Sequence, residues 1–115
     1  MKNKKLFAAL LSVAALNPEG FTISANTLQP ITKGFAVAMS ETQNSFGNAG
    51  LLRVIDFVTN SKTANAFGGW FDSVTGSFYW DTVTIVADLD TAKRLGRANG
   101  QIAIFDLENL KEIRL

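Results

Sequence analysis

Apolar residues recur along the chain with two different periods, and these periods divide it into helical and extended segments. Four apolar residues at i, i+3, i+4 and i+7 predict a helix over residues 48–60 with one apolar face: they are Leu51, Val54, Ile55 and Val58. A second helix is predicted over residues 90–99. We predict that Asp90 is the N-cap of this helix and that Gly100 ends it.

Extended segments lie between these helices. Residues 20–24 and 33–39 alternate apolar and polar side chains on either side of turn residues, which predicts a β-hairpin. A second hairpin is predicted from residues 66–71 and 77–86, with Gly76 closing the loop between them. The nearly continuous apolar run over 101–107 predicts an interior strand, and a short final strand follows around Ile113.

The first segment, residues 1–19, is consistent with two structures. A basic start followed by a mostly apolar run over 6–16 is typical of a secretory signal peptide, with cleavage after Ala15 or Ala25. The run is too short to span a bilayer. The same residues favour a buried helix, because Phe7, Leu10, Leu11 and Ala14 fall on one face and Pro18 then stops the helix. We favour the helix that belongs to the fold, with export as the alternative.

Composition supports one domain. The chain has 115 residues, of which 47% are hydrophobic and 18% charged, so it can bury a core without disulfides or metals. Residues 20–115 are predicted to form a single compact α+β domain after the N-terminal segment. Its antiparallel or mixed sheet is built from ββα-like units, with the helices packed on one face.

The sequence contains no Cys and no His, which excludes several chemistries. A Ser-His-Asp or Cys-His mechanism within the chain is impossible, and so is a zinc site that uses Cys. The net charge is +1, far from the basic balance of a typical nucleic-acid binder. We therefore predict a protein that is not an enzyme and that holds no cofactor, catalytic residue or metal.

The second predicted hairpin is rich in aromatic residues. Adjacent residues of a strand point to opposite faces, so the aromatic residues of 70–71 and 78–80 do not all belong to the core. Trp and Tyr are enriched in interface hot spots, so Trp70, Tyr79 and Trp80 are candidate partner-binding residues. The alternative is cross-strand packing, which commonly stabilises sheets.

Charged residues provide weaker candidates. Lys93, Arg94 and Arg97 form a basic patch on the helix predicted at 90–99, where they would contact phosphates or an acidic partner. The alternative is a solvated helix face. Asp72 and Asp81 flank the second hairpin, where paired carboxylates would do acid/base work or bind a hard cation. The alternative is that Asp72 forms the turn and Asp81 is solvent-exposed. We expect Phe46 to be tucked over the start of the helix at 48–60, and the alternative is an exposed Phe46 in a binding loop.

Four segments carry a resemblance. They are Lys-Gly-Phe-Ala-Val-Ala (33–38), Glu-Thr-Gln-Asn-Ser-Phe-Gly (41–47), Gly-Gly-Trp (68–70) and Gln-Ile-Ala-Ile-Phe-Asp (101–106). Over residues 20–115 the chain resembles small proteins of unassigned activity encoded by phages and mobile elements of Bacteroides-type gut bacteria. In those proteins a helix precedes the Gly-Phe-Thr start. The resemblance implies no catalytic or binding residues.

These observations lead to one expectation about function. We expect a small non-enzymatic protein, in the cytoplasm of its bacterial host, that binds a macromolecule. A protein partner is favoured over a nucleic acid, self-association is compatible with the sequence, and no membrane span is expected. The resemblance implies a host-defence inhibitor of the anti-CRISPR or anti-restriction type. The alternative is an exported structural or binding protein with a cleaved signal peptide.

Overall fold

A seven-stranded antiparallel sheet and three α-helices make up residues 2–115, which the computed structural model describes with side chains from Lys4 onward. In chain order the elements are α1 (Lys2–Leu16), β1 (Gly20–Ser24), β2 (Phe35–Ala38), the 3-10 turn η1 (Ser40–Thr42), β3 (Ser45–Phe46), α2 (Gly47–Asn60), β4 (Ala66–Asp72), β5 (Ser77–Val86), α3 (Leu89–Ala98), β6 (Ala103–Asp106) and β7 (Lys111–Arg114). The α+β class and the single compact domain are confirmed.

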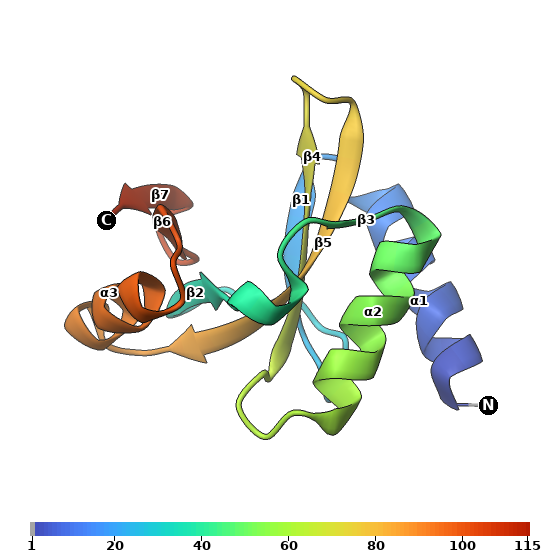
Figure 1. The fold of residues 1–115 in the computed structure, drawn as a ribbon, viewed down its shortest axis with the longest axis horizontal. Coiled ribbons are helices and arrows are strands. Elements are labelled where there is room, and N and C mark those ends of the chain that lie inside the picture. The colour runs from blue at the N-terminus through green and yellow to red at the C-terminus, as the bar shows by residue number, and fades with distance from the viewer. Residues whose placement is uncertain (1) are drawn as a thin grey trace.

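The long strand β5 organises the sheet. The strand order is β1-β4-β5-β2-β6-β7, and the short β3 also pairs with β5. Strand β4 therefore occupies one edge of β5, while β3 and β2 share the other edge. The β4–β5 hairpin projects beyond the rest of the domain (Figure 1). Its loop ends at Gly76 with φ +73°, as the sequence predicts.

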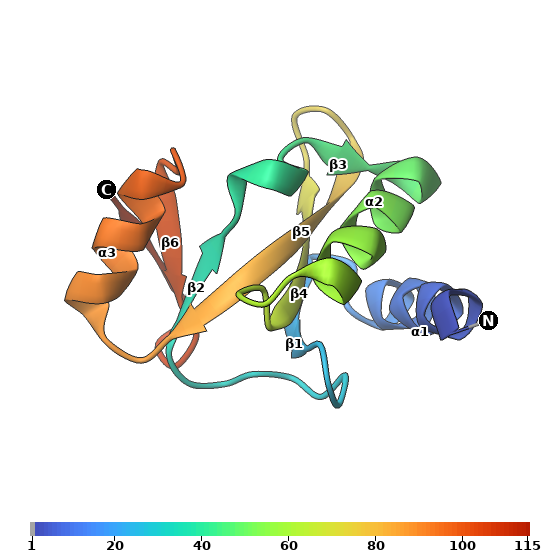
Figure 2. The same ribbon diagram turned by 60° about the horizontal axis from the view of Figure 1, so that its bottom comes forward.

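Strand register places all three helices on one face of the sheet. Phe67 lies opposite both Ile23 and Thr82 in the ladder, and these side chains share the face of Trp80. Helices α1 and α2 cover this part of the face. The buried core cluster beneath them consists of Leu10, Ile23, Leu51, Val54, Ile55, Phe67 and Trp80. Val37 lies opposite Thr84 on the same face, where it packs with Ala92 of α3 and Ile104. Within residues 2–115 the other face of the sheet carries no helix (Figure 2).

The predicted hairpin between residues 20–24 and 33–39 is wrong. Strand β1 pairs with β4, and β2 pairs with β5 and β6. The reason lies in residues 29–31, which fold back along the free edge of β1. The Ser24 N–H donates to the Gln29 carbonyl at 2.9 Å and the Ile31 N–H donates to the Thr22 carbonyl at 3.0 Å. That edge is occupied, so β2 pairs elsewhere in the sheet.

Helix α1 contributes directly to the core. Leu10 is fully buried, and Phe7 and Val13 pack against the same cluster. The helix ends where the Asn17 side chain donates to the Val13 carbonyl at 2.9 Å, just before Pro18. Among residues 2–115 no helix is long and apolar enough to cross a membrane.

The third helix is capped at both ends. Its N-cap is Asp88 rather than Asp90: one Asp88 carboxylate oxygen accepts from the Thr91 N–H at 2.9 Å and from the Thr91 hydroxyl at 2.8 Å. At the other end the Gly100 N–H donates to Arg97 and the Gln101 N–H to Gly96. This is the pattern that a glycine with positive φ permits, and Gly100 has φ +70°.

Candidate functional site

Three aromatic side chains meet on the helix-free face of the sheet. Phe46 of β3 and Trp70 of β4 both lie opposite Tyr79 of β5 in the ladder, so the three rings lie in a row across three strands. The Trp70 and Tyr79 rings stack with centroids 5.0 Å apart, and Phe46 meets Tyr79 edge to face at 5.7 Å. We call Phe46, Trp70 and Tyr79 the aromatic surface. Phe46 is 55% exposed and Trp70 is 44% exposed.

The position of Phe46 differs from the expectation of a ring tucked over the helix. Phe46 pairs with Tyr79 in the ladder, so its side chain must point to the face of Tyr79, away from α2. Gly47 follows with φ +68° and turns the chain directly from β3 into the helix. A two-residue strand this short leaves little signal in the sequence, which is why Phe46 was missed as a surface residue.

Trp80 does not belong to this surface. It points to the helix-covered face and is 5% exposed. Its ring meets Phe21 at 6.0 Å and Phe78 at 5.0 Å, both edge to face. The prediction that Trp80 lies on a partner surface with Trp70 and Tyr79 is therefore corrected: alternation along β4 and β5 sends it into the core.

The basic residues lie elsewhere. Lys93, Arg94 and Arg97 belong to α3, which covers the β2–β6 part of the sheet on the helix-covered face. Arg94 and Arg97 are exposed and Lys93 is half-buried. Helix α3 follows the C-terminal end of β5 and lies far from the tip of the β4–β5 hairpin (Figures 1 and 2). The structure thus brings Trp70 and Tyr79 together but separates them from the basic patch.

Asp81 lies beside the aromatic surface on the same face. It is half-buried, lies opposite Gly68, and forms no ion pair with any residue from Lys4 to Leu115. Burial raises the pKa of the Asp81 carboxyl to about 6, against a smaller opposing effect of a hydrogen bond from the Trp70 side chain. A carboxylate without a cation near its charge is poised to accept one.

Asp72 is not a partner for Asp81. Asp72 lies at the tip of the hairpin, where its carboxylate accepts from the Val74 N–H at 2.9 Å and from the Thr75 hydroxyl at 3.1 Å. In the ladder Asp72 lies opposite Ser77 and Asp81 lies opposite Gly68, so three residue pairs of the ladder lie between the two carboxylates. The acid/base pair considered from the sequence does not form, and Asp72 is a turn residue.

The raised pKa of Asp81 predicts an unusual pH dependence. Since the folded-state pKa lies above the usual value of 3.8, folding favours the protonated acid. This contribution is fully present below about pH 4 and is lost as the pH rises through 6. Asp81→Asn should raise the free energy of unfolding at neutral pH by roughly 2 kcal/mol and flatten its slope between pH 4.5 and 7, measured by urea denaturation.

Asp88→Asn is the matched control for this experiment. Hydrogen bonds from Thr91 lower the pKa of Asp88, so its contribution to stability is lost only at more acidic pH. Asn is also a good N-cap, so the helix keeps its cap. This variant should retain the wild-type slope between pH 4.5 and 7. An Asp81→Asn variant with the same slope as the wild type would show that Asp81 is not the titrating group.

Among residues 4–115, no group of three or more acidic side chains could hold a metal ion. The aromatic surface and Asp81 instead combine two exposed aromatic rings with a half-buried carboxylate on one face. Comparison with known proteins adds no assignment. No protein-family model matches the chain, no curated protein is significantly similar to it, and no solved structure matches its fold.

Proposed function

We propose that this chain is a non-enzymatic protein that binds another protein through the aromatic surface. The observation that supports this most directly is the row of three contiguous rings on the helix-free face, two of them about half exposed. Trp and Tyr supply much of the binding energy in protein interfaces, because they bury a large area with few rotatable bonds. Because paired strands hold these rings, they are presented without any rearrangement of the backbone.

Asp81 defines the chemistry of the partner. Its carboxylate is half-buried and lacks a cation, which is costly in the free protein. An Arg or Lys side chain from a partner would pair with Asp81 and lie against the face of Trp70, where a cation–π interaction adds to the ion pair. The proposed partner therefore presents a basic side chain at its interface. Asp81→Asn should weaken such a complex.

The resemblance to phage and mobile-element proteins suggests which partner to test. A bacterial defence component, such as a CRISPR or restriction nuclease, has basic surfaces that bind nucleic acid. A protein that covers such a surface would act as an inhibitor in the cytoplasm of its host. This class of partner is part of the proposal, and the exported alternative would instead predict an envelope partner.

The test is capture of partners from a related bacterial host, followed by measurement of affinity with purified components. Tagged full-length protein is compared with Trp70→Ala and with Phe105→Ala. Phe105 is the matched control, since it is 37% exposed on β6, away from the hairpin. Loss of the Trp70 ring should weaken binding by tenfold or more, which corresponds to about 1.4 kcal/mol or more.

The control fixes the interpretation. Phe105→Ala should keep wild-type affinity, and both variants should keep the wild-type circular dichroism spectrum. If Trp70→Ala and Phe46→Ala both bind the partner as tightly as the wild type does, the aromatic surface is not the interface. Failure to recover any specific partner at micromolar concentration would count against a binding function as a whole.

A further inference from the structure

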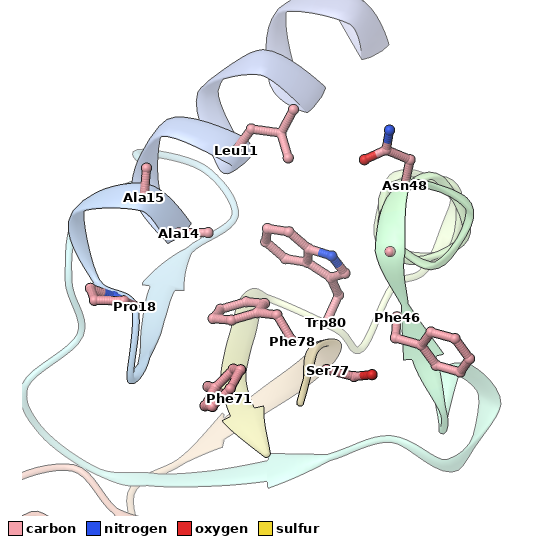
Figure 3. Close-up of a pocket in the computed structure, with 11 residues that line it drawn as sticks. Leu11, Ala14, Ala15, Pro18, Phe46, Asn48, Phe71, Ser77, Phe78 and Trp80 are labelled. Atoms are coloured by element: carbon pink, nitrogen blue, oxygen red, sulfur yellow. The ribbon is translucent and has the colours of Figure 1, made fainter. Parts of the chain in front are cut away.

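A groove of about 570 Å³ opens on the helix-covered side of the domain, and Phe46 is the one residue of the aromatic surface that also lines it. It lies between the second half of α1, the first turn of α2 and the β4–β5 hairpin (Figure 3). Its walls are apolar and include Leu11, Ala14, Ala15, Phe71 and Phe78, and no charged residue lines it. Its volume is in the range of small-molecule sites.

One end of the groove is formed by the start of α2. Gly47 and Asn48, the first two residues of this helix, line the groove. The first N–H groups of a helix have no partner within it, and here no side chain caps them and no acidic residue lies in the first turn. Those N–H groups carry the positive end of the helix dipole, which favours an anion.

A second donor faces the same end of the groove. Trp80 is 5% exposed, and its indole nitrogen points from the groove floor toward the start of α2 (Figure 3). This nitrogen donates to no acceptor among residues 4–115. Every fully enclosed side-chain nitrogen in that range has a hydrogen-bond partner, so the Trp80 nitrogen is not fully enclosed. The nitrogen is therefore open to the groove, where a bound acceptor would reach it.

We propose that this groove binds a small carboxylic acid with an apolar tail, of the medium-chain fatty acid class. The carboxylate lies against the first turn of α2 and the Trp80 N–H, and the tail lies along α1 and the rings of Phe71 and Phe78. The absence of a lining cation disfavours a phosphate, whose double charge needs a Lys or Arg. A singly charged carboxylate is matched by uncharged donors and a helix terminus. The groove shares Phe46 with the aromatic surface, whereas Trp70 and Tyr79 do not line it.

The test uses the intrinsic fluorescence of Trp80. The chain has two Trp residues, so a Trp70→Phe background leaves Trp80 as the reporter within the site itself. Sodium octanoate is titrated at neutral pH, with 1-octanol as a ligand that has the tail without the charge and acetate as one that has the charge without the tail. Octanoate should shift the emission of Trp80 and bind about tenfold more tightly than octanol, and acetate should not bind measurably.

Asn48→Asp provides a variant that changes charge at almost constant shape. The new carboxylate would compete for the α2 N-terminus, so octanoate affinity should fall about tenfold while octanol affinity stays the same. Asn26→Asp makes the same change in an exposed turn at the opposite end of β1, and should leave both affinities unchanged. Because Asn48 is exposed, neither change threatens folding.

Two results would overturn the proposal. Equal affinities for octanoate and octanol, unchanged by Asn48→Asp, would mean that the groove is an apolar depression without an anion site. No change in Trp80 emission with octanoate at millimolar concentration would mean that no carboxylic acid of this class binds there. Either result leaves the proposed protein-binding function of the aromatic surface untouched, since that is measured with Trp70→Ala and a protein partner.

Discussion

Phe67→Ala is expected to lower the free energy of unfolding by about 3–5 kcal/mol, the largest effect of any single substitution proposed here. Phe67 is 1% exposed and is the largest of the fully buried side chains. It lies opposite Ile23 on one neighbouring strand and Thr82 on the other, beneath α1 and α2. Its removal leaves a cavity that two rigid helices and a paired strand cannot close, so most of the cost of that cavity remains.

Urea denaturation followed by circular dichroism measures this effect, and Phe105→Ala is the control. Phe105 carries the same ring on strand β6 but is 37% exposed, so its loss should cost about 1 kcal/mol or less. A domain of this size has a stability of only about 5–15 kcal/mol, so the Phe67 variant should lose a large fraction of it. A loss below about 1.5 kcal/mol would show that the helices relax into the space.

Local patterns in the sequence predict the helices and strands well, because each pattern is set within a few residues. The stripe from Leu51 to Val58 lies in α2, and Gly76 and Gly100 adopt the positive φ expected of them. The β4–β5 hairpin is confirmed because a short loop fixes which strands pair. The α+β class and the placement of the helices on one face follow from the same patterns.

Strand pairing over longer distances is not predictable in the same way. The pairing of β1 with β4 joins residues separated by more than forty positions, and no local signal specifies it. The segment 29–31, which blocks the edge of β1, contains Pro30 and carries no strand pattern of its own. The predicted hairpin between β1 and β2 failed for this reason, and tertiary packing decided the topology.

The candidate site was predictable only in part. Alternation along β4 and β5 requires that neighbouring aromatic residues divide between two faces, but the sequence does not say which face the helices cover. Once Phe67 and Trp80 are assigned to the core, Trp70 and Tyr79 must be on the open face. Phe46 joins them through a two-residue strand, and the burial of Asp81 depends on this assembled face.

Gly50→Ala is expected to destabilise the protein by roughly 3 kcal/mol, against the direction of helix propensity. Ala is favoured over Gly within a helix by about 1 kcal/mol, so propensity alone predicts stabilisation. Gly50 lies where α2 crosses β3, and a Cβ atom there would be 2.5 Å from the carbonyl carbon of Ser45. That neighbour is backbone, which does not rotate away as a side chain would.

Hydrogen bonds also hold β3 and the preceding η1 in place, so we expect β3 not to move away from the new Cβ atom. The Ser45 hydroxyl donates to the Thr42 carbonyl at 2.6 Å, and the Arg53 guanidinium donates to the Glu41 carbonyl at 2.8 Å. The Thr42 hydroxyl in turn bonds that of Thr82 at 2.8 Å in the core. A shift of β3 would break the buried bonds of Ser45 and Thr42, at a cost comparable to the steric clash itself.

The matched control is Ala49→Gly, one residue earlier on the exposed side of α2, which should cost about 1 kcal/mol through propensity alone. Because Ser45 precedes Phe46, any strain at Gly50 that moves β3 also moves one ring of the aromatic surface. Gly50→Ala should therefore weaken partner binding even at temperatures where the variant is folded, whereas Ala49→Gly should not. A Gly50→Ala protein more stable than the wild type, with unchanged binding, would show that β3 adjusts freely and that the aromatic surface is not held in place by the helix behind it.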